Sequence, residues 1–221
     1  MIERLHDRYQ AGQLLAEKLT GLAKRPDAIV LGLPRGGVEV ACALGTRLGL
    51  PVDVFLVRKL GVPGYEELAM GAIATGGVEI VDPDVTEAFR VSKREVEEVV
   101  AVEKQELQRR DRVFRGSHPP LNLRDRTVIL VDDGIATGST MRAAIEGVRK
   151  LGAVRVIVAA GVAPLAICLS LRSEVDDVIC LLTPREFRAV GQFYEEFSQL
   201  TDQEVCKFLN DARKVVAKSA A

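Results

Sequence analysis

The sequence has no long apolar run and no excess of charge of either sign. Its amino-terminal residues become charged within the first few positions, and no apolar stretch approaches the roughly 18 residues that cross a bilayer. Thirty basic residues face 31 acidic ones, so the net charge of −1 provides no overall field to attract a polyanion such as DNA. These absences predict a cytoplasmic protein with no membrane partner, argue against nucleic acid as a partner, and require any phosphate site to be local.

Cysteine and histidine are scarce, and neither forms a recognisable reactive cluster. The spacing of the four cysteines does not resemble zinc-ligand or CxxC motifs, so we interpret them as reduced packing residues. The sequence shows no acid–histidine–nucleophile arrangement around either histidine, so we interpret both as non-catalytic. Neither GxGxxG nor GxxxxGK[ST] occurs, which disfavours dinucleotide and P-loop nucleotide sites. The residues concerned are Cys42, Cys168, Cys180, Cys206, His6 and His118.

Apolar runs alternate with helical stretches along most of the chain. With 48% hydrophobic and 28% charged residues, the 221-residue chain is long enough for one sizeable core. Runs bounded by Gly, Pro or Asp predict strands that are buried on both faces. This alternation predicts an α/β fold with an open parallel sheet, on which ligands bind beyond the carboxyl ends of the strands. The predicted strands are 28–32, 52–57, 127–131, 154–160 and 178–182, and the predicted helices between them are 38–48, 139–151 and 164–172.

Two segments depart from this alternation and divide a single domain, 1–221, into parts. Residues 60–81 are rich in glycine and predict a loop with a short hairpin, and 83–115 predict a charged helical segment that is broken near residues 91–92. Together they form an insertion at about 60–115 in a core of about 25–182. The aromatic-rich segment 183–221, which has a capping box at 201–204, is expected to be a hood or lid, or a docked tail. At the other end, residues 6–22 have the pattern of an amphipathic helix that covers the core.

The most specific pattern is residues 128–140, in which a buried strand ends in two carboxylates and a hydroxyl-rich turn then opens a helix. Backbone N–H groups at the start of that helix would converge on a phosphate, and nearby hydroxyls add donors. The adjacent carboxylates of Asp132 and Asp133 repel each other unless they share a cation or a hydrogen-bond donor. A vicinal diol, a magnesium ion, or both would serve. The hydroxyl donors are Thr137, Ser139 and Thr140.

Two further patterns provide positive charge and close backbone approach. The loop at residues 32–38 follows the first predicted strand, where Arg35 would neutralise an anion and Gly36 and Gly37 would let backbone amides approach it. Arg58 and Lys59 leave the end of the second predicted strand, and we expect at least one of them to be functional.

Residues 128–140 resemble the phosphoribosyl pyrophosphate signature of the type I phosphoribosyltransferases, and the loop at 32–38 is similar to the pyrophosphate loop of that family. The whole chain looks like a branch of predicted members with no settled acceptor. The resemblance implies a parallel core sheet with a variable hood contributed by the chain termini. It also implies a cis peptide between Pro34 and Arg35, and a mobile loop that begins near Arg58.

The same resemblance implies a role for each site residue. Asp132 and Asp133 would hold the ribose 2- and 3-hydroxyls and Mg²⁺, the metal being bound through the substrate or through water. Residues 136–140 would wrap the 5-phosphate, and the catalytic set would be Asp132, Asp133, Arg35 and Lys59. The full substrate-binding set is Pro34, Arg35, Gly36, Gly37, Arg58, Lys59, Asp132, Asp133, Gly134, Ala136, Thr137, Gly138, Ser139 and Thr140.

The function expected from this resemblance is transfer of ribose 5-phosphate from phosphoribosyl pyrophosphate to a nitrogen nucleophile, such as a nucleobase, in nucleotide or nucleoside metabolism. The partners would be phosphoribosyl pyrophosphate and a small-molecule acceptor, with a homodimer as one alternative for the oligomeric state. A second hypothesis is a regulator that senses phosphoribosyl pyrophosphate without transferring it. A third, a pure interaction module built on the helix at 83–115, leaves the two phosphate loops unexplained.

Overall fold

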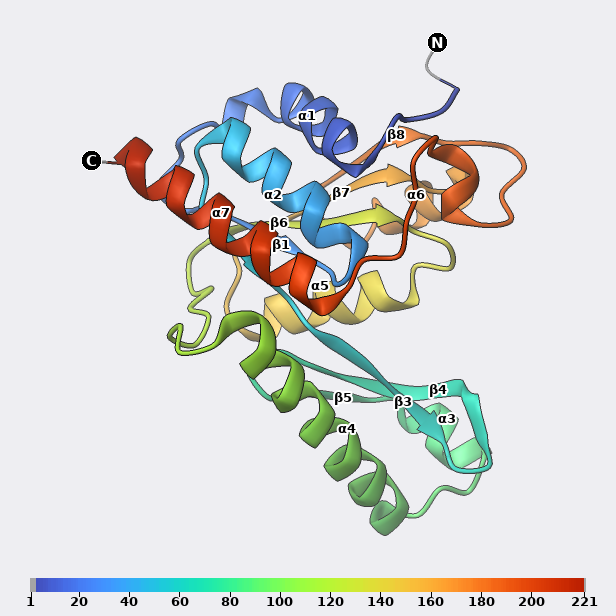
Figure 1. Ribbon diagram of the computed structural model, residues 1–221. Helices are drawn as coiled ribbons and strands as arrows, with labels where there is room; N and C mark the ends of the chain where they lie inside the picture. Colours follow the sequence, from blue (N-terminus) through green and yellow to red (C-terminus); the bar gives the residue numbers. More distant parts are fainter. Residues whose placement is uncertain (1–2, 221) are drawn as a thin grey trace.

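A parallel sheet of five strands forms the centre of the protein (Figure 1). The computed structural model describes residues 3–220, and the side chains of residues 3–216. Every neighbouring pair of strands in this sheet is parallel, which confirms the predicted open α/β fold. In spatial order the strands are β2 (Val52–Val54), β1 (Ala28–Gly32), β6 (Thr127–Gly134), β7 (Arg155–Val162) and β8 (Asp177–Leu182).

The two faces of the sheet are covered by different helices, as the two-residue period of a strand requires. Along β6, Val128 and Leu130 pack into one apolar cluster, and Ile129 and Val131 pack into the other. The first cluster contains α5 and α6, and the second contains α1, α2 and α7. Their bounds are α1 (Arg8–Lys18), α2 (Gly36–Leu48), α5 (Ser139–Lys150), α6 (Leu165–Leu171) and α7 (Asp202–Ala220).

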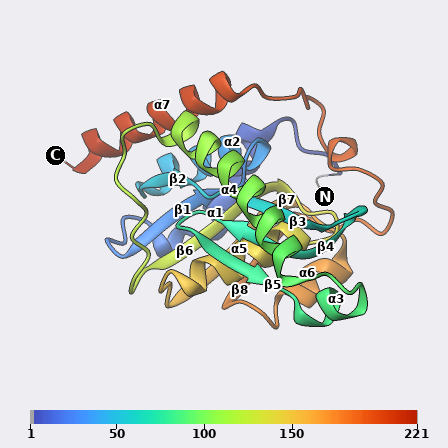
Figure 2. The same ribbon diagram turned by 90° about the horizontal axis from the view of Figure 1, so that it is seen from below.

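The insertion forms a second, antiparallel sheet that projects from the core (Figure 1). Its helix α4 packs along this sheet, as the view from below shows (Figure 2). The predicted helix break is confirmed, since Arg90 has a φ of 52° and Ser92 caps the next helix in a capping box with Glu95. The elements are β3 (Val57–Val62), β4 (Tyr65–Ala74), β5 (Val78–Val81), α3 (Pro83–Ala88) and α4 (Lys93–Arg115).

The expectation of a loop from residue 60 to 70 was wrong, because the glycines there serve close strand contact. Gly61 lies at an irregularity in the β3–β4 register, and a Cβ on it would be 2.7 Å from the carbonyl oxygen of Glu66. A Cβ on Gly71 would be 2.1 Å from the carbonyl oxygen of Ile80. Glycine therefore permits this sheet to form.

The predicted strand at 52–57 is also divided, because the chain changes sheets there. The N–H of Phe55 still donates to Gly32 of β1, at 3.0 Å, whereas the carbonyl of Leu56 accepts from Thr75, beside β4, at 2.9 Å. β2 therefore ends at Val54, and β3 begins at Val57.

The two ends of the chain meet at the core. Leu5 pairs with Tyr194 as an isolated bridge, and residues 183–200 contain only the short 3₁₀ helix η2 (Val190–Phe193). A second 3₁₀ helix, η1 (Thr20–Leu22), follows α1. α7 begins at the predicted capping box and packs on α2 and α4.

Within residues 3–220, no helix is long and apolar enough to span a bilayer.

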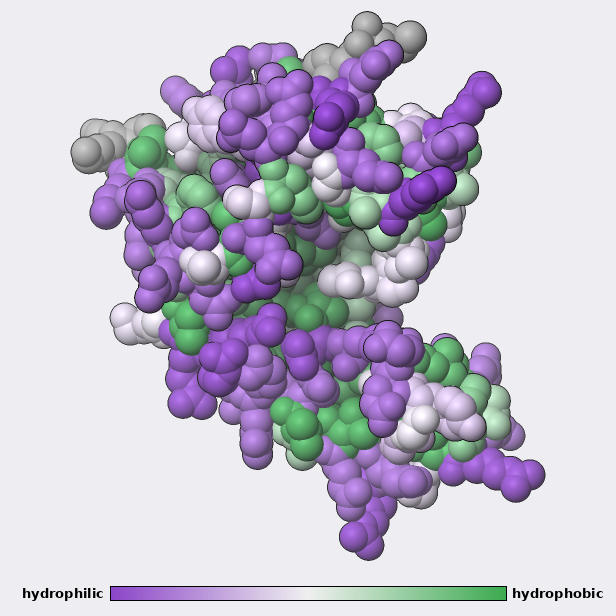
Figure 3. All heavy atoms as spheres, turned by 45° about the vertical axis from the view of Figure 1, so that its right-hand side comes forward, coloured by the Kyte–Doolittle hydropathy of each residue, from purple (hydrophilic) through white to green (hydrophobic). Residues whose placement is uncertain are grey.

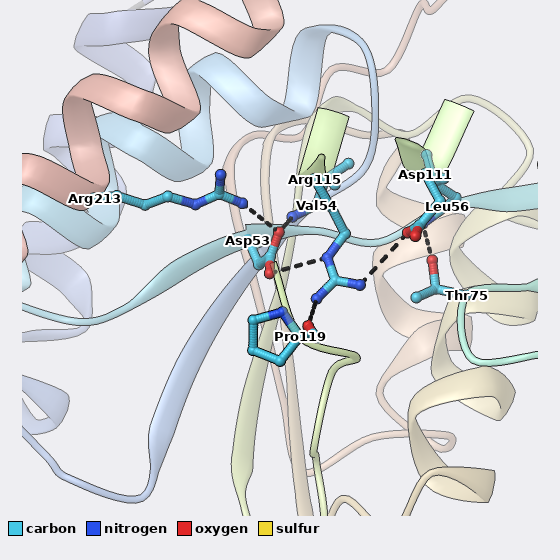
Figure 4. A network of polar contacts seen from close by, with 8 residues as sticks. All are labelled: Asp53, Val54, Leu56, Thr75, Asp111, Arg115, Pro119 and Arg213. Carbon is cyan, nitrogen blue, oxygen red and sulfur yellow. Dashed lines mark hydrogen bonds and ion pairs between the residues drawn. The ribbon is translucent and has the colours of Figure 1, made fainter. Parts of the chain in front are cut away.

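A buried ion-pair network joins the insertion to the core and to α7 (Figure 4). Asp53 of β2 accepts from Arg115 Nε at 3.2 Å and from Arg213 Nη2 at 2.9 Å. Arg115 is 5% exposed and Asp53 is 13% exposed, and Arg115 also contacts Asp111 and the carbonyl of Pro119. The Asp53 carboxylate therefore contacts two guanidinium groups from separate parts of the chain.

We expect Asp53→Ala to lower the free energy of unfolding by about 3 kcal/mol, because it removes the carboxylate that Arg213 and the buried Arg115 share. Urea unfolding checks this value. In Glu97→Ala the lost pair with Lys93 is solvent-exposed, so the change should stay below about 0.5 kcal/mol. Equal effects of the two substitutions would contradict the importance of the network.

Candidate functional site

The two predicted phosphate loops leave neighbouring strands at the same edge of the sheet. β1 and β6 pair in parallel register, with Gly32 opposite Val131, and the N–H of Leu33 donates to the carbonyl of Val131 at 2.9 Å. The loop after β1 and the acidic pair at the end of β6 are therefore brought together. In Figure 1 the arrows of the parallel sheet point to the right, and Figure 3 turns that side of the molecule partly toward the viewer. It shows a hollow between the core and the insertion.

Two glycines let the first loop press directly against the acidic pair. A Cβ on Gly36 would lie 1.8 Å from Asp133 Oδ2, and a Cβ on Gly37 would lie 2.8 Å from the Cα of Asp132. No larger residue fits at either position without movement of the acids. The peptide between Pro34 and Arg35 is cis, as the resemblance implies, and Arg35 is exposed at the start of α2.

The two carboxylates of the pair differ in their environments. Burial raises the pKa of Asp132 well above its ordinary value, and the negative charge of Asp133 raises it further. Asp132 Oδ1 accepts from the backbone N–H of Asp133 at 2.9 Å. Asp133 Oδ2 instead accepts from Arg8 Nε at 2.8 Å, in an ion pair whose side chains are only 7% and 13% exposed. Arg8 therefore provides, within the protein, a cation for one carboxylate of the pair, Asp133.

Residues 136–140 form a donor-rich turn at the amino end of α5, in which every residue but Gly138 is exposed. Gly138 caps the helix with a φ of 82°, in the left-handed region that favours glycine. The hydroxyls of Thr137 and Ser139 lie 3.1 Å apart, and Thr140 is exposed in the first turn. Arg142 donates to the carbonyl of Thr137 at 3.2 Å, which ties the turn to its helix. Free N–H groups at a helix start attract anions, so this geometry suits a phosphate.

The two cations of β3 have different surroundings. Arg58 Nε pairs with Glu103 of α4 at 2.6 Å. Lys59 lines a cavity of about 510 Å³ between α5 and the three-stranded sheet, and Ser139 and Thr140 line the same cavity. The Nζ of Lys59 donates to the carbonyl of Glu67 at 2.9 Å. The structure thus brings Lys59 toward the hydroxyl-rich turn, whereas Arg58 is engaged with the insertion helix.

Sequence reasoning gave no role to Arg8 or Phe197, which contact the acidic pair or its partner, and it considered Tyr194 only as a ring that could stack on a planar base or pack in the hood. Arg8 also donates through Nη1 to the carbonyl of Ser198, and its guanidinium lies 4.0 Å from the centre of the Phe197 ring. Tyr194 Oη donates to the backbone carbonyl of Asp133 at 2.6 Å. One signal was available for Arg8, because it falls on the same helical stripe as the buried residues Ala11 and Leu15 of α1.

Comparison with known proteins gives a consistent result. A family model described as a phosphoribosyl transferase domain matches residues 1–181. Sequences from two strains of Mycobacterium tuberculosis, provisionally named as phosphoribosyl transferases, are 42% identical over 215 residues, or 97% of this chain and 48% of theirs. The chain therefore spans about half the length of these curated relatives. A crystal structure of a Thermus thermophilus protein is 40% identical, with a TM-score of 0.82 over 94% of this chain and 98% of that one.

The raised pKa of Asp132 predicts an unusual effect of pH on stability. A carboxyl group that binds its proton more tightly in the folded state makes the protein more stable as pH falls from the raised pKa toward the ordinary value of about 3.9. Asp132→Asn stays neutral, so it should raise the free energy of unfolding near neutral pH and remove this part of the pH dependence. Denaturant unfolding at several pH values tests this, with the exposed Asp125→Asn as control. A loss of stability at neutral pH in Asp132→Asn alone would contradict it.

The contact of Gly36 with Asp133 also predicts a steric effect. Gly36→Ala should lower the free energy of unfolding by about 2 kcal/mol, because the added methyl group displaces the carboxylate and its arginine. A Cβ on Gly21 would meet no heavy atom within 4 Å, so Gly21→Ala should change stability by less than about 0.5 kcal/mol. Thermal and urea unfolding of both variants provide the comparison, and equal stabilities would rule out the tight contact.

Proposed function

Since the chain belongs to the phosphoribosyl transferase family, we propose that it binds phosphoribosyl pyrophosphate with Mg²⁺ and transfers ribose 5-phosphate to a nitrogen nucleophile, such as a nucleobase. The observation that carries this proposal is the meeting of the glycine loop, the acidic pair and the hydroxyl-rich helix start at one sheet edge. The reaction would belong to nucleotide or nucleoside metabolism in the cytoplasm.

The sugar phosphate would bind along the end of β6. Asp132 and Asp133 accept hydrogen bonds from the 2- and 3-hydroxyls, beside Gly134, and carboxylates are strong acceptors for such donors. Ala136 and the turn that follows it bind the 5-phosphate through backbone N–H groups and through the hydroxyls of Thr137, Ser139 and Thr140. This division matches the exposure of the turn and the closer packing around the acids.

The pyrophosphate would lie on the loop after β1. Arg35 contributes charge, and the backbone around Pro34, Gly36 and Gly37 allows close approach. In the reaction the bond between C1 and the pyrophosphate oxygen breaks, and pyrophosphate leaves with the electron pair. The acceptor nitrogen forms the new bond to C1 and loses its proton. Arg35 and Lys59 would stabilise the leaving charge, and the carboxylates would lie near the positive charge that develops on the sugar.

The donor set fits a magnesium ion that the substrate carries with it. Asp132 and Asp133 offer oxygen ligands, which Mg²⁺ prefers. Among the described residues no group of three or more Asp, Glu, His or Cys side chains could hold a metal, so most ligands would come from water and from substrate phosphates. When bound, the ion would neutralise charge on the pyrophosphate.

The proposed reaction predicts base-dependent release of pyrophosphate. Wild-type protein mixed with Mg²⁺, phosphoribosyl pyrophosphate and single nucleobases should release pyrophosphate with at least one base.

Asp133→Asn removes charge and acceptor capacity, so binding of phosphoribosyl pyrophosphate should weaken about ten- to a hundredfold. Thr137→Val removes one phosphate donor, so it should weaken binding of ribose 5-phosphate and phosphoribosyl pyrophosphate alike. Titration calorimetry measures both effects.

Different outcomes of these measurements separate the alternatives. Tight binding without turnover for any base would favour a sensor of phosphoribosyl pyrophosphate, and absence of binding in the presence of Mg²⁺ would refute both. The basic stretch of α4 gives a nucleic-acid-binding regulator little support, because several of its cations are held by carboxylates. These are Lys104 with Glu79, Arg109 and Arg110 with Glu106, and Arg115 with Asp53.

A further inference from the structure

Both ends of the chain converge on one residue of the acidic pair. Arg8, in the first turn of α1, reaches the side chain of Asp133, and Tyr194, from the segment after η2, reaches its backbone carbonyl. A Cβ on Gly161 of β7 would lie 2.0 Å from Tyr194 Oη, so a glycine is needed for the tyrosine to dock there. Asp133 is therefore held at two points by segments that are distant in sequence.

The contacts of Arg8 use three parts of its guanidinium at once. Nε donates to Asp133 Oδ2, Nη1 donates to the carbonyl of Ser198, and the flat face lies on the ring of Phe197. A planar group with donors along its edge meets all three requirements, whereas a lysine ammonium provides neither the fork nor the face. With an exposure of 7%, the Arg8 side chain is fixed in this arrangement.

A purely structural role explains this arrangement poorly. Arg8 shares the buried stripe of α1 with Ala11 and Leu15, where an apolar residue would pack without the cost of burying a charge. The partner of that charge is Asp133, at the end of the strand that leads into the phosphate turn. An ionised carboxylate has about four acceptor positions, so the contact with Arg8 leaves capacity for ligand hydroxyls.

We propose that Arg8 is a positioning residue of the sugar site, which holds the Asp133 carboxylate in the orientation that receives the ribose hydroxyls and which makes both chain termini part of that site. This inference rests on the proposed function. Gly36 lies against the same ion pair, since its Cβ would be 2.9 Å from Arg8 Nε. The glycine loop, the acidic pair and the termini therefore share one contact.

The test compares a ligand that carries the diol with one that lacks it. Titration calorimetry of Arg8→Gln with ribose 5-phosphate and Mg²⁺ should show affinity at least about tenfold weaker than wild type. Affinity for magnesium pyrophosphate, which has no hydroxyls for Asp133, should stay within about twofold. Arg8→Lys keeps the charge without the fork and should fall between wild type and Arg8→Gln for ribose 5-phosphate.

Arg4 provides a matched control in the same segment. Its guanidinium also joins the two termini, but it donates to the backbone carbonyl of Tyr194 rather than to a site carboxylate. Arg4→Gln should therefore leave both affinities unchanged. Should Arg8→Gln fail to fold, Phe197→Leu offers a second test, because it removes the ring under Arg8. Its affinity for ribose 5-phosphate should fall, by a smaller factor than in Arg8→Gln, while its affinity for pyrophosphate stays unchanged.

Two results would overturn the positioning role. One is that Arg8→Gln, or both Arg8→Lys and Phe197→Leu, bind ribose 5-phosphate as tightly as the wild-type protein does. The other is an equal loss for ribose 5-phosphate and pyrophosphate, which would indicate general loosening of the fold. If wild-type protein binds neither ligand, the proposed function itself fails. If wild type binds both ligands and Arg8→Gln binds them equally well, only the positioning role fails, so the two failures are distinguishable.

Discussion

The contact between Gly36 and the carboxylate of Asp133 is the constraint on which the site depends. It exists because β1 and β6 are parallel neighbours, so their loops leave the sheet side by side. A side chain at residue 36 would occupy the position of the Asp133 oxygen. The glycine therefore determines how near the first loop comes to the acids. That separation in turn sets the space in which one ligand would touch both.

The charge of Asp133 is balanced within the protein, and this links the ends of the chain to the centre of the sheet. Arg8 pairs with Asp133, whereas burial and its neighbour's charge make Asp132 a weaker acid. A second buried network, around Asp53, joins the insertion and α7 to the core. Ion pairs thus attach the chain termini, and the insertion with α7, to the core. In each case the carboxylate, Asp133 or Asp53, lies on a strand of the parallel sheet.

Much of the fold was predictable from sequence, because buried parallel strands are nearly continuous apolar runs. The run before Asp132 and the hydroxyl-rich turn after Gly138 are local patterns, and the structure has a strand and a helix start at those positions. Residues 60–70 were misjudged because glycine permits both flexibility and close strand contact, and sequence alone does not separate them. Arg8 was missed because its partner lies 125 residues away. The roles of the individual site residues stay predictions.

The most direct test of the central claim is a crystal structure of this protein with Mg²⁺ and phosphoribosyl pyrophosphate. We expect the ribose 2- and 3-hydroxyls within hydrogen-bonding distance of Asp132 and Asp133, with the 5-phosphate on the backbone of residues 137–140. Arg8 should keep its contact with Asp133 in that complex. A ligand bound elsewhere, or a 5-phosphate away from the start of α5, would contradict the assignment.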